Sequence, residues 1–71
     1  MTADHQVIAK VGRLTSSISP GGLGEVMLPI RGGSEVYFCY AADPSEEIPK
    51  GTRVVVIEHD QPRTVIVSRY P

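Results

Sequence analysis

The 71-residue chain has few of the features that usually cross-link a small domain or indicate its function. A single cysteine allows neither an internal disulfide nor a zinc site built from cysteine pairs. A net charge of −1 argues against a dedicated nucleic-acid-binding protein, which usually carries a basic surplus. No apolar run approaches the roughly 20 residues that span a bilayer. The first residues also lack the basic start and apolar stretch of a signal peptide.

The composition that remains is that of a soluble globular protein, with 41% hydrophobic and 21% charged residues. The length allows one domain, which we place over residues 1–71 with an ordered core of about residues 7–69. A domain of this size buries only about 60% of its unfolded-chain surface. Without a disulfide or metal, a closed barrel is the expected solution, because it leaves few free strand edges.

Apolar residues alternate with polar ones along most of the chain, which predicts strands. Strands are expected over residues 7–14, 23–30, 35–42, 53–58 and 63–69. Glycine-rich turns are expected at Ser19–Gly22 and Arg31–Ser34. A helix between the third and fourth strands is not expected, because Pro44 and Pro49 leave no full turn free. The pattern predicts an all-β, five-stranded OB-like Greek-key barrel, and an SH3-like barrel stays open as the alternative.

Four details of the strands are expected from their residues. The apolar parity of the first strand changes at Gly12, which predicts a bulge or bend there. Pro29 cannot donate to a ladder, so its nitrogen should face an edge or a bulge. The apolar run Arg53–Glu58 predicts a strand covered on both faces. Ile48 is the large apolar residue of the polar 43–52 connection, and we expect it to plug one end of the core.

The third strand is the most strongly β-prone stretch and has two possible phases. In the preferred phase Val36, Phe38 and Tyr40 point inward. Tyr37 and Cys39 then point outward. The opposite phase remains open.

Residues with catalytic or metal-binding potential are few, and we expect neither enzyme activity nor a cofactor. The glycine-rich Pro20–Gly24 lacks the lysine of a phosphate-binding loop and is expected to be a turn. Glu58, His59 and Asp60 alternate between strand faces and so cannot share one ion with the distant His5. Cys39 has no neighbouring cation in sequence to activate its thiol. The serines and lysines likewise lack a nucleophile elbow.

Two segments resemble the NfeD-like C-terminal soluble domain. The first comprises Gly12, Leu14, Thr15 and Ile18–Val26, and the second is Glu47–Glu58 with its lysine–glycine–threonine turn. Together the resemblance covers about residues 11–68. It implies a small OB-like barrel at the C-terminus of a membrane protein. It also implies association with stomatin- or flotillin-type proteins that organise bacterial membrane microdomains.

Longer members of that family also carry transmembrane helices and an N-terminal serine protease domain. Neither lies within these 71 residues, which fits an excised soluble domain or a naturally short form. The resemblance implies a position on the cytoplasmic face of the membrane in a full-length parent. This chain alone would be soluble.

The resulting hypothesis is a non-enzymatic protein–protein interaction module without a small-molecule substrate. The expected partner contacts are two turns, with Leu23 as the apolar anchor of the first. Their residues are Pro20, Gly21, Gly22 and Leu23 in the first turn, and Arg31, Gly32 and Gly33 in the second.

Two alternatives stay open. The first is single-stranded nucleic-acid binding, with Tyr37 or Tyr40 as a stacking platform. The second and weaker is an accessory domain of a membrane serine protease.

Overall fold

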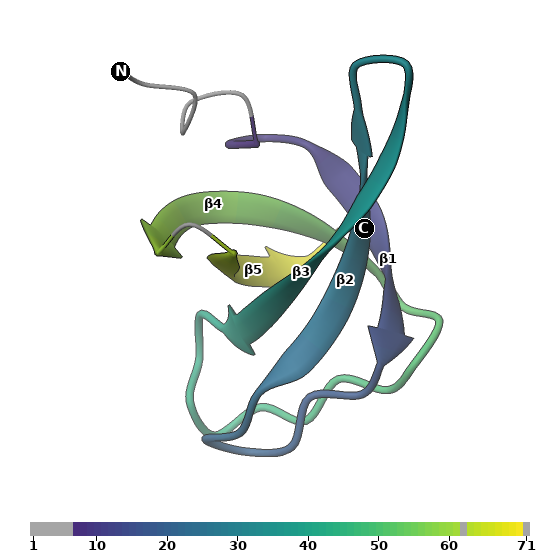
Figure 1. Ribbon diagram of the computed structural model, residues 1–71. Helices are drawn as coiled ribbons and strands as arrows, with labels where there is room; N and C mark the ends of the chain where they lie inside the picture. The colour runs from purple at the N-terminus through teal and green to yellow at the C-terminus, as the bar shows by residue number, and fades with distance from the viewer. Residues whose placement is uncertain (1–6, 62, 71) are drawn as a thin grey trace.

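The computed structural model describes residues 7–61 and 63–70, which form five strands and no helix (Figure 1). The strands are β1 (Val11–Ser16), β2 (Gly24–Ile30), β3 (Gly33–Ala41), β4 (Arg53–Gln61) and β5 (Thr64–Arg69). No helix long and apolar enough to cross a membrane is present in this part of the chain.

The strands close into a barrel in the order β1-β2-β3-β5-β4, with β4 pairing back onto β1. Four of the pairings are antiparallel, and β3 and β5 run parallel. This order is that of the Greek-key OB barrel. The predicted OB-like fold is therefore confirmed, and the SH3-like alternative is wrong.

Small and branched side chains from every strand fill the barrel. The following strand residues have side chains that are essentially inaccessible to solvent: Leu14, Val26, Leu28, Cys39, Val54, Val56, Val65 and Val67. They lie at alternate positions of their strands, as a sheet with one buried face requires. Burial of this apolar set is the main stabilising contribution in a domain whose single cysteine allows no internal disulfide.

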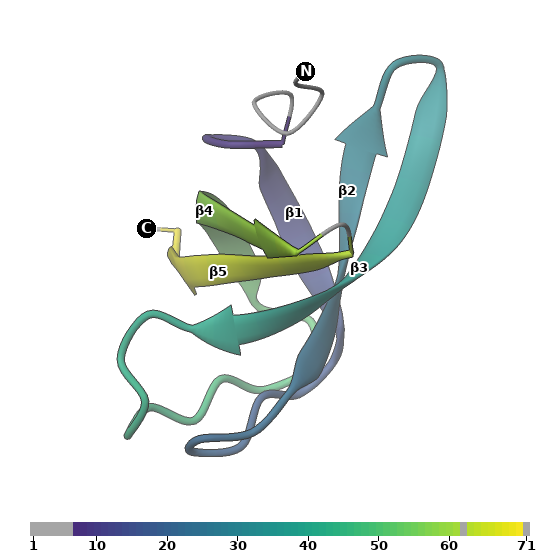
Figure 2. The same cartoon turned by 60° about the vertical axis from the view of Figure 1, so that its left-hand side comes forward.

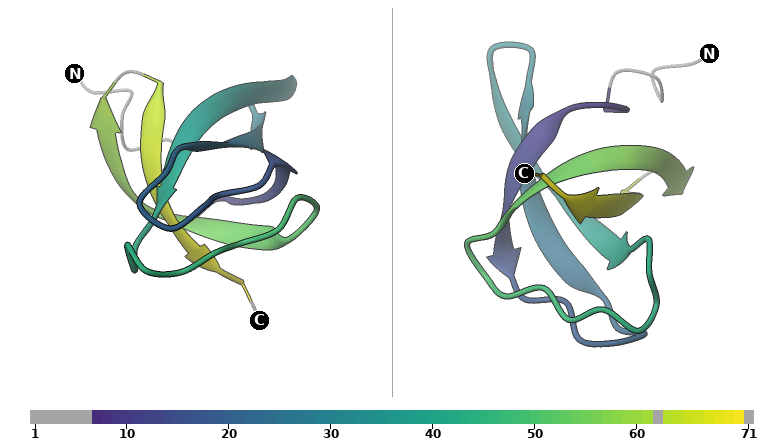
Figure 3. Two further views of the ribbon diagram at one scale, coloured as in Figure 1. Left: turned by 90° about the horizontal axis from the view of Figure 1, so that it is seen from below. Right: turned by 180° about the vertical axis from the view of Figure 1, so that it is seen from behind.

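The lower end of the barrel is closed by two isoleucines. Ile18, in the β1–β2 connection, and Ile48, in the β3–β4 connection, form an isolated antiparallel bridge. They are 1% and 0% exposed. Seen from below, the two connections lie across the same end of the barrel (Figure 3). The prediction that Ile48 plugs the core is confirmed.

The other end is closed by Val7, which is 2% exposed. It belongs to a turn, not to β1, which begins only at Val11. The Lys10 N–H donates to the Val7 carbonyl at 3.1 Å, and Ala9 has a φ of 73°. The expectation of a strand from residue 7 is wrong, because the turn buries Val7 while an extended chain would carry it past the barrel.

Gly12 is a point of close approach and not the predicted bulge. The register of β1 and β2 shifts between Leu14 and Ser16 instead. A Cβ on Gly12 would lie 2.3 Å from the Met27 carbonyl oxygen and 2.7 Å from Leu28 Cδ2. A side chain is excluded at this position because the backbone of β2 occupies its place.

The third strand adopts the phase that was not preferred. Tyr37 and Cys39 are buried, whereas Val36, Phe38 and Tyr40 are 39–45% exposed. Cys39 is paired with Gly24, and a Cβ added to Gly24 would approach Ile18 Cγ1 to 2.6 Å. The interior is closely packed at this level, and the small Cys39 side chain is fully enclosed there.

The fourth strand has only one face in the core. Val54 and Val56 are buried, Val55 is half-buried, and Ile57 is 42% exposed. The prediction of burial on both faces is wrong. In this barrel no second layer covers the outer face of β4.

The β2–β3 hairpin extends beyond the rest of the barrel (Figure 2). Its loop is the two residues Arg31 and Gly32, since Ile30 is paired with Gly33. The pairing of β1 with β2 reaches only as far as Met27. Pro29 therefore lies past β1 on a free edge, as a proline within a strand requires.

Candidate functional site

The β1–β2 turn (Ser19–Leu23) is held tightly and exposes one large apolar side chain. The Gly22 N–H donates to the Ser19 carbonyl at 2.8 Å, and Gly21 has a φ of 70°, which favours glycine. Ile18, directly before the turn, is anchored in the core. Leu23 is 48% exposed at the end of the turn. The turn therefore presents Leu23 from a rigid base.

A small hollow of about 230 Å³ lies beside this turn. Its lining residues are Gly21, Gly22, Tyr40, Ala41 and Pro44. The fold therefore brings together Tyr40, predicted as a stacking residue, and two glycines predicted as partner contacts. An aromatic ring, a proline and bare glycine backbone form an apolar recess suited to a partner side chain.

The acidic loop next to the hollow is ordered by its own contacts. The backbone N–H and hydroxyl of Ser45 donate to Asp43 Oδ1 at 3.0 and 2.8 Å. These bonds hold the pKa of Asp43 below its usual value. Arg69 Nε lies 2.6 Å from Glu46 Oε2, and the same guanidinium donates to the Glu47 carbonyl. Glu46 is thus already paired within the domain.

The second predicted contact, the β2–β3 turn (Arg31–Gly33), lies at the opposite end of β2 from the first. Arg31, Gly32 and Gly33 are exposed, and Gly32 has a φ of 77°. The seven residues of β2 separate the two turns. At about 3.4 Å per residue that distance is roughly 24 Å. The two turns therefore do not form one contact patch. Their positions do not favour either turn as the partner contact.

Tyr37 is not available as a stacking platform. It is 9% exposed and packs edge-to-face on the His59 ring at 6.2 Å between centroids. The Arg63 guanidinium lies over its ring at 5.3 Å. Phe38, which sequence reasoning placed in the core, is 45% exposed on the same side of β3 as Tyr40. Exposure of Phe38 follows from the opposite phase of the third strand, which the sequence left open.

Cys39 is buried, and burial raises the pKa of its thiol to about 12, with the charge of Glu25 adding to the shift. A thiol in this environment is a poor nucleophile. Among residues 7–61 and 63–70, no three histidine, cysteine or carboxylate side chains are grouped to hold a metal ion. His5, which the metal hypothesis involved, lies outside the described residues.

A family model described as the NfeD C-terminal domain matches residues 11–68. No curated protein matches the chain in sequence.

Three solved structures share the fold. The soluble domain of the NfeD protein YuaF from Bacillus subtilis is 22% identical, with a TM-score of 0.73 over 87% of this chain and 71% of that one. A soluble domain from Corynebacterium glutamicum, of a membrane protein implicated in regulation of membrane protease activity, is 21% identical, with a TM-score of 0.76 over 94% and 97%. The C-terminal domain of stomatin operon partner protein 1510-C from Pyrococcus horikoshii is 25% identical, with a TM-score of 0.71 over 100% and 98%.

Proposed function

This chain belongs to the NfeD C-terminal domain family, and on that premise we propose that it is a non-enzymatic protein–protein interaction module of an NfeD-like membrane protein. Its partner is a stomatin- or flotillin-type scaffold protein that organises membrane microdomains. The observation that carries the proposal is the family match over nearly the whole barrel. The description of one similar structure as a stomatin operon partner supports the class of partner. The domain acts on the cytoplasmic face of the membrane.

The β1–β2 turn with its hollow is the contact we propose for that partner. Leu23 is exposed, and its neighbours Gly21, Gly22 and Tyr40 line an apolar recess. Binding energy in an interface usually concentrates in well-packed pockets that exclude water and on aromatic residues such as Tyr40. Leu23 adds exposed apolar area at the same turn. The turn is also pre-organised, because its position depends on buried Ile18, so binding has little ordering entropy to overcome.

A capture experiment tests the proposal. Tagged domain is incubated with detergent-solubilised membranes and cytosol from its source organism, and the bound proteins are identified by mass spectrometry. We expect specific enrichment of a stomatin- or flotillin-type protein. Capture with Leu23→Asp should lose that protein, whereas Ile57→Asp, which changes a similarly exposed apolar residue of β4, should retain it. Enrichment of no such protein by the unaltered domain contradicts the proposal.

One observation favours a second candidate, single-stranded nucleic-acid binding. Phe38 and Tyr40 are exposed on the outer face of β3, and strands 2 and 3 form the nucleic-acid-binding face of many OB-folds. This mode depends on stacking and on phosphate contacts, so its affinity falls steeply with salt. Titration of a labelled oligothymidylate at low and high salt decides it. No binding at low salt, or binding unaffected by salt, removes this candidate.

A further inference from the structure

Two arginines face each other across the seam that closes the barrel. Arg13 of β1 and Arg53 of β4 are direct partners in the antiparallel register, and both are exposed. Side chains at directly opposite positions have Cβ atoms about 4.5–5.5 Å apart, and like charges placed there repel. Within the described part of the chain, Arg63 and Arg69 pair with Glu35 and Glu46, whereas neither seam arginine has a carboxylate partner. The seam therefore carries an uncompensated double positive charge.

Both guanidinium groups are held in place by neutral groups. Arg13 Nη1 donates to the Gly51 carbonyl at 3.2 Å. The Arg53 guanidinium lies over the Tyr70 ring at 5.3 Å. A carbonyl uses one of five N–H donors, and stacking on a ring leaves the in-plane donors free. The two side chains are thus positioned, and most of their donors are available to an anion.

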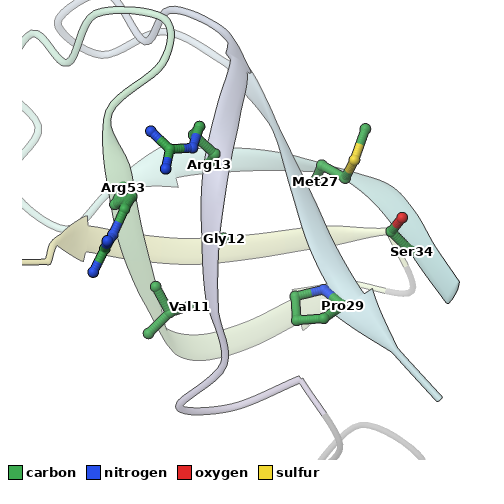
Figure 4. Close-up of a pocket in the computed structure, with 7 residues that line it drawn as sticks. All are labelled: Val11, Gly12, Arg13, Met27, Pro29, Ser34 and Arg53. Carbon is green, nitrogen blue, oxygen red and sulfur yellow. The ribbon is translucent and has the colours of Figure 1, made fainter. Parts of the chain in front are cut away.

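An apolar hollow adjoins the arginine pair (Figure 4). It has a volume of about 300 Å³, and its lining is mostly apolar. Besides the two arginines its lining residues are Val11, Gly12, Met27, Pro29 and Ser34. Figure 4 shows the Arg13 side chain extending toward β4, with Met27, Pro29 and Ser34 on the other side of β1. The two arginines therefore lie on the β4 side of β1 together with Val11, whereas Met27 and Pro29 lie on the β2 side together with Ser34.

We propose that this hollow, the arginine-seam site, binds an extended acidic and apolar peptide segment of a partner protein. A carboxylate of the segment accepts hydrogen bonds from Arg13 and Arg53. A neighbouring aliphatic side chain occupies the hollow against Met27 and Pro29. The inference rests on the proposed function as an interaction module, and it names a second contact on a different face from Leu23.

Charge favours a peptide over a membrane or a nucleic acid. The domain has a net charge of −1, and Asp43, Glu46 and Glu47 lie in the connection at the lower end of the barrel. A broad anionic surface would meet these carboxylates as well as the arginines. A single carboxylate requires only the local pair, and the planar donor groups of arginine match its two oxygens. The arginine pair and the adjoining hollow are therefore complementary to a peptide that carries a carboxylate next to an apolar side chain.

Panning of a random dodecapeptide phage library against the domain identifies what the site accepts. We expect the enriched sequences to combine glutamate or aspartate with an adjacent aliphatic residue. The most enriched peptide, made synthetically, should shift the backbone NMR signals of Val11, Arg13, Met27 and Arg53. Its affinity should fall at least about tenfold in the Arg13→Gln/Arg53→Gln double variant, the loss expected when charged hydrogen bonds are removed. Lys50→Gln, which removes an exposed positive charge from the β3–β4 connection, is the matched control and should bind normally.

A second measurement keeps the result independent of any effect of the double variant on folding. A version of the peptide with glutamine for each glutamate and asparagine for each aspartate should bind the unaltered domain at least about tenfold more weakly. Equal affinity of the two peptides, enrichment without acidic residues, or no enrichment overturns the inference. So does arginine-dependent binding of oligothymidylate or of phosphatidylglycerol vesicles in place of peptides. The capture experiment with Leu23→Asp reports on the proposed function separately, so failure of one is distinguishable from failure of the other.

Discussion

Ile18 and Ile48 exchange both of their backbone hydrogen bonds, with N–O distances of 2.8 and 2.9 Å, although they lie 30 positions apart in the chain. Each side chain is essentially inaccessible. The pair ties the β1–β2 connection to the β3–β4 connection and closes the barrel below β2 and β3. Because Ile18 immediately precedes the β1–β2 turn, the same contact positions Leu23 on the surface.

Truncation of this plug should cost a large part of the domain's stability. Ile48→Ala removes a fully buried side chain and leaves a cavity, for which we expect a loss of roughly 2–5 kcal/mol in the free energy of unfolding. Urea denaturation followed by circular dichroism measures it. Ile8→Ala, at a residue 40% exposed in a turn, is the control and should cost far less. Equal losses in the two variants would contradict the role of Ile48.

Gly12 and Gly33 provide a matched pair of substitutions. Gly12→Ala places a methyl group 2.3 Å from the Met27 carbonyl oxygen, so β1 and β2 must separate. Overpacking of this kind costs typically about 1–3 kcal/mol. Gly33→Ala meets no atom within 4 Å and should change stability little. Thermal unfolding of the two variants checks the difference, and a stable Gly12→Ala protein would show that β1 and β2 are not so closely packed.

Most strands and turns could be predicted because their determinants are local. Turns at Ser19–Gly22 and Arg31–Gly32 follow from glycine and proline, and alternation in β2 identifies its buried face. The polar connection predicts Ile48 as a plug, because that is the one large apolar residue it contains. The turns and the buried face of β2 depend on neighbours in sequence, whereas the bridge of Ile48 with Ile18 forms only in the folded barrel.

The buried face of β3 and the pairing of residues between distant strands depend on packing and could not be predicted. Both faces of β3 are apolar, so hydrophobicity does not distinguish Tyr37 and Cys39 from Phe38 and Tyr40. Space inside the barrel decides, through the pairing of Cys39 with Gly24. The Arg13–Arg53 relationship likewise arises only when β4 closes onto β1, between residues 40 apart in the chain.

The buried thiol of Cys39 should make stability fall at alkaline pH. Its folded pKa of about 12 exceeds the ordinary value of 9.0. Between these values the unfolded chain releases the thiol proton while the folded chain retains it, so unfolding becomes more favourable as pH rises. Urea denaturation at pH 8 and pH 10 should show this decline, and Cys39→Ala should show a smaller one. An equal decline in both proteins would assign it to other groups.

The same burial predicts a protected thiol. At pH 8 the native domain should react with a thiol reagent such as dithionitrobenzoate only slowly, and urea should release rapid reaction. Rapid reaction of the native protein would contradict the position of Cys39 inside the barrel.

The affinity of the purified domain for a purified stomatin- or flotillin-type protein from the same organism, with and without Leu23→Asp, tests the central claim most directly. Calorimetry should detect binding by the unaltered domain. Leu23→Asp should lower the affinity at least about tenfold, because it places a charge at the apolar contact. Its thermal midpoint should stay unchanged, because Leu23 is 48% exposed. Absence of binding by the unaltered domain would contradict the interaction-module function, and equal binding by Leu23→Asp would reject the β1–β2 turn as the contact.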